Sequence, residues 1–109
     1  MKELLASNYG IKLSSENDAI TVLETGAPGM IFTINEFGED FFDLKNGILG
    51  GTFQKFANYR FPVAIVLPAD HNFGLRVTEL AREHAKHSLI RFCTNISEAE
   101  QWLNQKLSD

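Results

Sequence analysis

Apolar residues in the middle of the chain follow two patterns, one after the other. Between residues 40 and 59 they recur at steps of seven, four and three, which places them on one face of a helix. These positions are Phe42, Leu49, Phe53 and Phe56. The next run, residues 63–67, is apolar throughout and is bracketed by prolines. Such a run is typical of a strand buried on both faces of a parallel sheet, so the two segments predict a helix packed on a sheet.

Shorter patterns predict further strands on either side. Two segments around residues 8–10, Asn-Tyr-Gly, predict a small hairpin, because Asn and Gly favour turns. Residues 2–6 also fit the start of a helix. Residues 29–34 are rich in β-branched and aromatic side chains and predict a buried central strand. Residues 89–93 predict a strand at or near the edge of the sheet.

Capping signals and apolar stripes predict three more helices. The first begins at Ser15, because Ser15 and Asp18 have the spacing of a capping box with Asp in place of Glu or Gln. The second spans residues 72–87. The last begins at Ser97, which has a glutamate three residues later.

The order of these elements predicts one α/β domain over residues 1–109. We expect a mixed sheet of four to five strands with about four helices, mainly on one face. At 109 residues the chain has the common domain size and is long enough to bury a core without disulfides.

Three glycines interrupt the helix predicted over residues 40–59. Gly47, Gly50 and Gly51 each cost roughly 1 kcal/mol relative to alanine inside a helix. They predict a break near Gly47, or a place where another backbone or a ligand approaches closely. The simpler interpretation is that the helix packs closely on the sheet at these positions.

Composition and charge exclude several classes of function. A hydrophobic content of 44% indicates a globular chain, and a net charge of −4 argues against binding to nucleic acids or to anionic membranes. The single cysteine, Cys93, permits no intrachain disulfide and no cysteine metal cluster. The N-terminus lacks the apolar run of a signal peptide, and no stretch approaches the length of a membrane span. We therefore expect a soluble cytoplasmic protein.

Three stretches carry a resemblance to a known family. They read DFFDLKNG at residues 40–47, QKFANYR at residues 54–60 and VAIV at residues 63–66. Together they resemble a small bacterial domain family of unknown function with the pattern DFFxLxxG, QKFxNYR and an AIV-type strand. The resemblance extends over residues 18–103. More distantly, the order of elements and the closing SEAEQWL helix at residues 97–103 are similar to STAS and SpoIIAA-like domains.

The STAS resemblance makes a specific statement about phosphorylation. In phosphoregulated members, the helix after the third strand begins with Asp-Ser-Ser-Gly-Leu-Gly, and its second serine accepts the phosphate. The matching run here is residues 43–49, which places Asn46 at the acceptor position. An amide cannot be phosphorylated, and Thr52 lies too far into the helix to replace it. The resemblance therefore implies a domain without a serine phosphoswitch.

Polar residues after the most apolar strand form a candidate ligand site. In open α/β sheets ligands bind beyond the carboxyl ends of the strands, where Asp70 and His71 follow residues 63–67. Polar residues of the glycine-containing segment can lie at the same end. The candidate ligand-binding residues are Asp43, Asn46, Gly47, Asp70 and His71. The alternative is a solvated loop, since Asp and His in loops are mostly exposed.

Other reactive side chains do not form a recognisable catalytic or metal site. His84 and His87 share one helical face, but two ligands are too few for zinc, and His71 lies about 20 Å away at the other end of that helix. Cys93 lies in a strand without an obvious base, which indicates a buried thiol. We therefore predict no catalytic residue, no metal and no cofactor, and favour a non-enzymatic protein over an enzyme. A small enzyme that uses Asp43, Asp70 or His71 is a third hypothesis.

These observations lead to two functional hypotheses. The first is a binding or regulatory module that acts through a protein partner or as a homodimer, using an exposed aromatic patch such as Phe41, Phe73 or Tyr9. The alternative is a domain that binds a small molecule or lipid, with a pocket between the helix at residues 47–51 and the Asp70–His71 loop.

Overall fold

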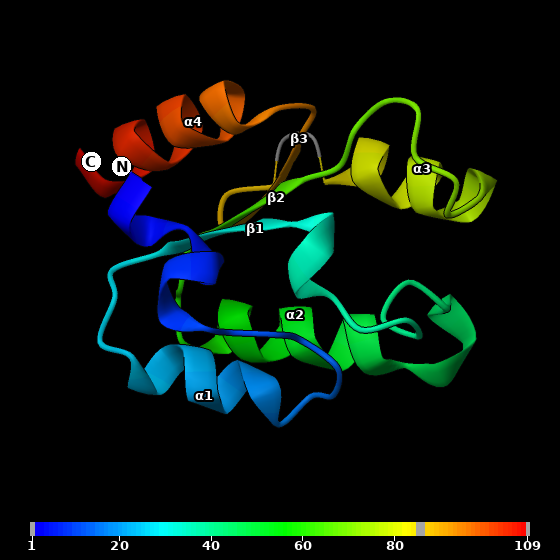
Figure 1. Cartoon of the computed structure of the whole chain (residues 1–109), viewed down its shortest axis with the longest axis horizontal. Helices are drawn as coiled ribbons and strands as arrows, with labels where there is room; N and C mark the ends of the chain where they lie inside the picture. Colours follow the sequence, from blue (N-terminus) through cyan, green and yellow to red (C-terminus); the bar gives the residue numbers. More distant parts are fainter. Residues whose placement is uncertain (1, 85–86, 109) are drawn as a thin grey trace.

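The strands predicted over residues 29–34, 63–67 and 89–93 form one parallel sheet. The computed structural model describes residues 2–84 and 87–108. Strands β1, β2 and β3 lie side by side in that order, so β2 is central (Figure 1). Their bounds are Met30–Thr33, Val63–Val66 and Ile90–Cys93. All four residues of β2 are buried, which confirms the prediction of a strand covered on both faces.

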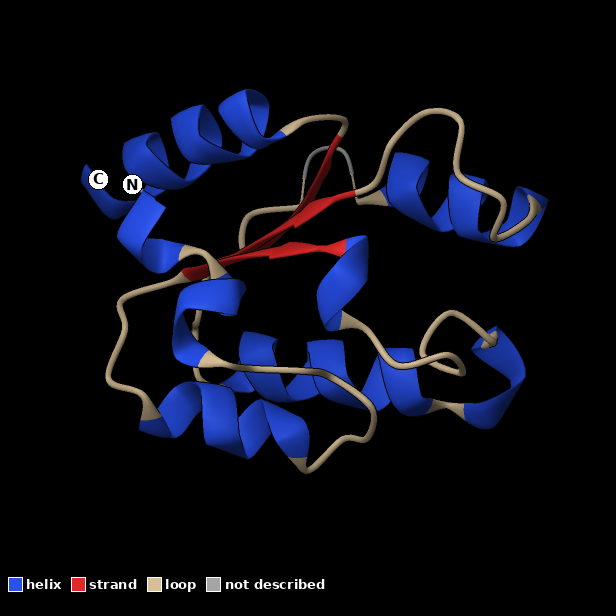
Figure 2. Cartoon of the chain, viewed as in Figure 1, coloured by secondary structure: helices blue, strands red, loops and turns tan. Residues whose placement is uncertain are grey.

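Four α-helices surround the sheet in the described part of the chain (Figure 2). Their bounds are Asp18–Glu24 for α1, Ile48–Asn58 for α2, Leu75–Glu83 for α3 and Ile96–Ser108 for α4. Short 3-10 turns precede or join them: η1 at Lys2–Leu4, η2 at Ala6–Tyr9, η3 at Ile34–Glu36 and η4 at Leu44–Asn46. The helix predicted over residues 72–87 is shorter, and its positions 85 and 86 lie outside the described residues.

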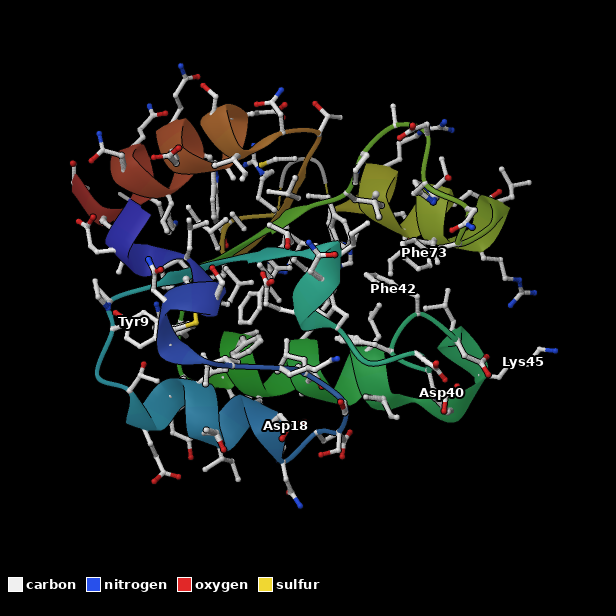
Figure 3. The ribbon with its side chains drawn as sticks, viewed as in Figure 1. Tyr9, Asp18, Asp40, Phe42, Lys45 and Phe73 are labelled. Carbon is white, nitrogen blue, oxygen red and sulfur yellow. The ribbon has the colours of Figure 1, made fainter. Side chains whose placement is uncertain are left out.

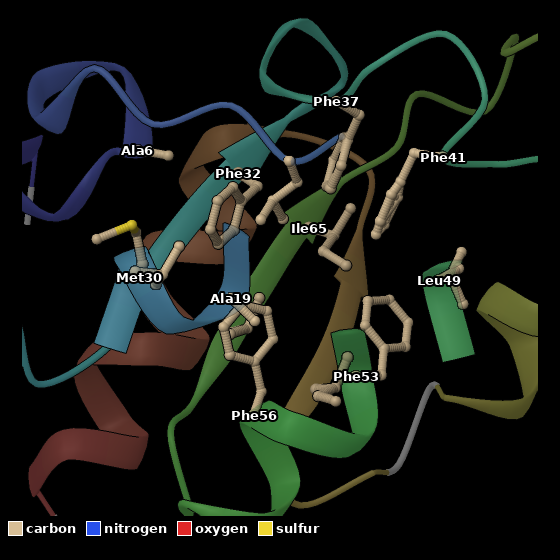
Figure 4. Packing of buried hydrophobic residues seen from close by; sticks show 14 of the residues in the cluster. Ala6, Ala19, Met30, Phe32, Phe37, Phe41, Leu49, Phe53, Phe56 and Ile65 are labelled. Atoms are coloured by element: carbon tan, nitrogen blue, oxygen red, sulfur yellow. The ribbon is translucent and has the colours of Figure 1, made fainter. Parts of the chain in front are cut away.

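Alternate strand residues point into two separate clusters. Phe32 and Ile65 belong to a cluster with residues of α1 and α2 (Figure 4). The same cluster includes the buried Val77 of α3. Ile31 and Ala64 pack with α4 on the other face. Three helices therefore contribute to one cluster and one helix to the other.

The phenylalanines of α2 anchor the larger cluster. Phe53 is 6% exposed and Phe56 is completely buried, as the helical pattern predicts. The rings of Phe32 and Phe56 lie 6.3 Å apart between their centroids. This contact fixes α2 across the sheet and so determines where the segments that flank α2 emerge.

The N-terminal segment does not form the predicted hairpin. It folds into η1 and η2 and forms two isolated parallel bridges, Leu5 to Ile31 of β1 and Leu13 to Phe37, which follows η3. Residues 2–8 contain no β-branched side chain, so the segment gains little from an extended ladder and buries its apolar side chains from turns. The prediction of four to five strands in a mixed sheet was therefore wrong for the described residues. The same topology places β1 at an edge rather than in the centre.

The second helix begins at Ile48 and not at Asp40. Gly47 has a φ of 77°, a left-handed conformation that glycine adopts without steric cost, and it confirms the predicted break. Asn46 organises the turn before the break. Its side-chain amide donates to the carbonyl oxygen of Asp40 at 2.8 Å, and its Oδ1 accepts from the N–H of Ile48 at 2.9 Å. Phe42 therefore reaches the core from a loop and not from a helical face.

The start of α1 and the cap of α4 differ from those predicted. The carboxylate of Asp18 accepts from the N–H of Ser15 at 3.0 Å, which is one of the two bonds of the predicted capping box, but α1 begins at Asp18 and not at Ser15. Before α4, Oδ1 of Asn95 accepts from the N–H of Glu98 at 2.8 Å. Asn95 therefore caps α4, and the predicted start at Ser97 lies two residues too late.

Candidate functional site

A hollow of about 390 Å³ lies beyond the carboxyl ends of β1 and β2. Residues 42–45 line one side and residues 73–77, at the start of α3, line the other. We call it the Phe42–Phe73 groove. This is the end of a parallel sheet at which ligands of α/β proteins bind, because the loops that follow the strands meet there.

Aromatic rings form the floor of the groove. The rings of Phe42 and Phe73 lie 4.5 Å apart between centroids, and Figure 3 shows them next to each other. Phe42 is 7% exposed and also contacts Phe41 in the core at 5.4 Å, so the floor is an outward extension of the hydrophobic interior. Leu75 stands at the rim with 71% of its surface exposed. The side chain of Leu75 therefore extends the apolar surface of the floor outward to the rim.

Two cations flank this apolar surface. Lys45 lies on one wall and Arg76 on the other. In the described part of the chain neither of them forms an ion pair within 4.0 Å. Asp43, on the same wall as Lys45, uses its carboxylate locally and accepts from the Lys45 N–H at 3.2 Å, which caps η4. The groove therefore combines an apolar floor with two positive charges that have no counter-charge in contact.

His71 holds the second wall in place. Its Nδ1 accepts from the N–H of Phe73 at 3.2 Å, and its ring stacks on the Phe73 ring at 5.7 Å. Because Nδ1 accepts, the proton of the neutral imidazole sits on Nε2, which lies 3.0 Å from Oγ1 of Thr78. The Thr78 hydroxyl then donates to the Gly74 carbonyl oxygen at 3.3 Å. This chain of bonds ties the loop after β2 to the first turn of α3.

The sequence of this chain matches the model of one protein family. The family is described as a domain of unknown function (DUF4180), and the match covers residues 2–103, including all three strands and both walls of the groove. The chain belongs to the DUF4180 family. This confirms the prediction of a family of unknown function. No curated protein and no solved structure matches the chain.

The DUF4180 domain brings only some of the predicted site residues together. Asp43 lines the Phe42–Phe73 groove, and His71 supports its wall through Phe73. Asn46 and Gly47 line a different hollow of about 410 Å³, beside the segment before α1. Asp70 is exposed. His71 therefore positions one wall of the groove, and Asn46 caps a turn.

Several groove residues were missed in the sequence. Lys45, Leu75 and Arg76 give no motif, because residues 42–45 and 73–77 are distant in sequence and meet only in the fold. Leu75 lies outside the apolar stripe predicted for this helix, but single apolar residues at such positions are common and give no signal of a site. Of the aromatic residues predicted to be exposed, Phe41 is completely buried, whereas Tyr9 is 38% exposed and Phe73 is partly buried.

We expect His71→Ala to destabilise the DUF4180 domain by about 1–2 kcal/mol, because it removes two side-chain hydrogen bonds and the ring under Phe73. Urea unfolding followed by circular dichroism measures the change. Asp70→Ala is the matched control, since Asp70 is the exposed neighbour in the same loop and should change stability by less than about 0.5 kcal/mol. Equal losses in both variants would contradict the role given to His71.

His87 is a second histidine with a structural task. Its Nδ1 accepts from the N–H groups of Leu89 at 3.1 Å and Ile90 at 3.0 Å, which fixes the entry into β3. Burial lowers the pKa of His87 from its usual 6.5, and the nearby His84 and Arg91 lower that pKa further. A protonated Nδ1 cannot accept either bond, so the folded state requires a neutral ring.

The domain is therefore expected to lose stability as the pH falls below about 6.5. Above that pH the ring is neutral in both states. Below it the unfolded chain binds the proton first, so the free energy of unfolding decreases until the lower pKa of the folded state is passed. Urea unfolding at several pH values measures this slope. His87→Asn should flatten it, because an amide oxygen can accept from the same N–H groups and does not titrate. An unchanged slope in this variant would refute the assignment.

Other reactive groups do not form a site in the described residues. Burial raises the pKa of the Cys93 thiol to about 11, with the charge of Glu98 adding to the effect, so this thiol is protonated at neutral pH. His84 and His87 stack at 5.3 Å between ring centroids, but residues 2–84 and 87–108 hold no group of three or more potential metal ligands. None of the described helices is both long and apolar enough to cross a membrane.

Proposed function

We propose that this DUF4180 domain is a non-enzymatic binding module that acts through a protein partner. The Phe42–Phe73 groove is the contact surface, and its occupant is a partner segment with an apolar side chain next to a carboxylate. The observation that carries the proposal is the exposed Leu75 at the rim of a groove floored by two phenylalanine rings.

The apolar part of the groove supplies the driving force for binding. Complete burial of a leucine side chain is worth about 1.5–3 kcal/mol. Leu75 is 71% exposed, so most of this free energy is available to a partner. The Phe42 and Phe73 rings already pack against each other, which means that the floor needs no rearrangement before a partner docks. Aromatic floors with an apolar rim are typical centres of protein interfaces.

The charges of the groove select the partner. Lys45 and Arg76 lie on opposite walls and outnumber Asp43, the one carboxylate of the lining, so the groove is a weakly positive site on a chain whose net charge is −4. A carboxylate in the partner segment would pair with both. Glu79 and Glu83 line the adjoining hollow further along α3. The two ends of the surface therefore have opposite charge, which favours one orientation of the bound segment.

A random peptide library displayed on phage provides a direct test. The wild-type domain is the bait, and Leu75→Glu is used to remove peptides that bind elsewhere. We expect the selected peptides to share an apolar residue beside Asp or Glu. A synthetic peptide with that sequence should bind in fluorescence polarisation, and Leu75→Ala and Arg76→Gln should each weaken its binding at least tenfold.

Tyr59→Ala is the matched control, because Tyr59 is 72% exposed and lies outside the groove. It should leave the affinity unchanged within about twofold. Selection of peptides that bind Leu75→Ala as tightly as the wild type would overturn the proposal. Sedimentation equilibrium tests the homodimer separately. A dimer that Leu75→Glu dissociates would show that a second copy of the chain, and not a partner protein, occupies the groove.

A second candidate function is the binding of a small molecule or lipid in the same groove. Its volume of about 390 Å³ is within the range of small-molecule sites. The pocket would then lie between residues 42–45 and α3, with His71 behind its wall. A thermal-shift screen would favour this function if a hit lost its effect in Phe73→Ala and kept it in Tyr59→Ala.

The proposal includes no serine phosphoswitch. Asn46, at the position that the STAS resemblance gives to the phosphoacceptor, uses both ends of its side-chain amide to join Asp40 to Ile48. The turn before α2 depends on this amide, and kinases do not phosphorylate amides. We therefore propose that a STAS-like module of this kind binds its partner constitutively.

A further inference from the structure

A second hollow lies on the face of the sheet that α4 covers, beside the edge strand β3. It has a volume of about 280 Å³ and is independent of the Phe42–Phe73 groove. Five side chains line it: Ser88, Arg91, Trp102, Gln105 and Lys106. Trp102, Gln105 and Lys106 are spaced i, i+3 and i+4, so α4 presents all three on one face. Two of the five lining residues are cations and none is acidic.

Arg91 is held in place in this hollow, and most of its N–H hydrogen-bond donors are unused. Its guanidinium carbon lies 5.4 Å from the centroid of the Trp102 ring, a cation–π contact that holds the guanidinium plane over the indole. Nη2 makes one long hydrogen bond of 3.4 Å to the His87 carbonyl oxygen, and Nε is buried without a partner. A guanidinium has five N–H donors, so the described protein atoms use only a small part of its capacity.

The remaining polar groups surround Arg91 with further donors. Lys106 supplies an ammonium group, Gln105 an amide and Ser88 a hydroxyl. In the described part of the chain no carboxylate forms an ion pair with Arg91 or Lys106. The carbonyl groups at the end of α4 are partly negative and oppose an anion, but two full charges outweigh that effect.

We infer that this hollow binds a phosphate group, either as inorganic phosphate or as a phosphate monoester. Two parallel N–H groups of the Arg91 guanidinium can donate to two phosphate oxygens. The guanidinium neutralises one negative charge of the phosphate, and the Lys106 ammonium group neutralises the other. Ser88 and Gln105 donate to the oxygens that remain. A carboxylate has only two oxygens and one charge and would leave part of this donor set unused, whereas a phosphate uses all of it.

Trp102 makes the inference testable, because it is the only tryptophan in the sequence and lies in the wall of the hollow. Inorganic phosphate is titrated into the full chain at pH 7.5 and constant ionic strength, with chloride as the compensating anion. We expect a saturable change in Trp102 emission and a saturable heat in isothermal titration calorimetry. Lys106→Gln should weaken binding at least tenfold, because it removes one charge and leaves the Arg91–Trp102 contact intact.

The control variant is Lys12→Gln, which changes the net charge equally at an exposed position away from the hollow. It should change the affinity by less than twofold, as should Leu75→Ala in the groove. Two results would overturn the inference. One is a linear change in Trp102 emission with phosphate that chloride reproduces. The other is an equal affinity of Lys106→Gln and the wild type for phosphate. Tighter binding of acetate than of phosphate would also overturn it. Titration with glycerol phosphate then distinguishes inorganic phosphate from a phosphate monoester as the ligand. If glycerol phosphate binds as tightly as inorganic phosphate or more tightly, the hollow is a monoester site. If it binds more weakly, the hollow is a site for inorganic phosphate.

Discussion

Replacing Phe56 by alanine is expected to destabilise the domain by about 3–5 kcal/mol. The ring is completely buried in α2, and it lies 6.3 Å from Phe32 of β1 and 5.6 Å from Phe61 between centroids. Its loss would leave a cavity between the helix and the sheet. Domains of this size have a total stability of about 5–15 kcal/mol, so the variant should unfold at a much lower urea concentration.

Two variants make this expectation decisive. Phe56→Leu keeps most of the volume and should lose only about 1 kcal/mol, so it is measurable even where the alanine variant does not fold. Tyr59→Ala, just beyond the same helix, removes an aromatic ring that is 72% exposed and should change stability by less than about 0.5 kcal/mol. Similar losses at Phe56 and Tyr59 would show that α2 does not pack on the sheet by this face.

The second large effect is expected at Gly29, where alanine should cost about 1–3 kcal/mol. A Cβ atom there would lie 2.9 Å from Cδ1 of Leu103 and 3.0 Å from the carbonyl oxygen of Pro62. That oxygen accepts from the N–H of Met30 at 3.2 Å, at the start of β1. The backbone of residue 62 is thus held by the sheet and cannot move aside, so the added methyl group forces α4 or β1 outward.

Gly50→Ala is the opposite case and serves as the matched variant. Gly50 lies inside α2, and no heavy atom outside the local helix backbone is within 4 Å of the Cβ position. Alanine should therefore stabilise the domain by about 0.5–1 kcal/mol through the helix backbone alone. Thermal unfolding of Gly29→Ala and Gly50→Ala under the same conditions measures the change in stability of each variant. Stabilisation by both substitutions would contradict the close approach of α4 to Gly29.

The strands and helices that depend on local pattern were predictable from the sequence. Residues 63–66 are apolar throughout and form the buried centre of the sheet, and Phe53 and Phe56 lie on the predicted face of α2. The N-terminal segment was not predictable in this way. Its conformation depends on two isolated bridges, Leu5 to Ile31 and Leu13 to Phe37, and on burial against β1, none of which has a sequence period.

The candidate site was predictable only in its location. Asp43 and His71 follow strands whose carboxyl ends meet, and both belong to the end of the sheet that carries the groove. Their tasks were not predictable. Whether a polar side chain caps a turn, supports a ring or faces a ligand depends on distances of about 3 Å, which the order of elements does not determine.

The isolated bridge between Leu5 and Ile31 also has a consequence for self-assembly. Growth of a sheet from molecule to molecule needs two open edges on every copy, each with unpaired N–H and C=O groups. The N-terminal turns block the side of β1, which leaves β3 as the exposed side in the described part of the chain. Copies that join through β3 can form a pair, but a pair has no free side left, so fibre formation stops at its first step.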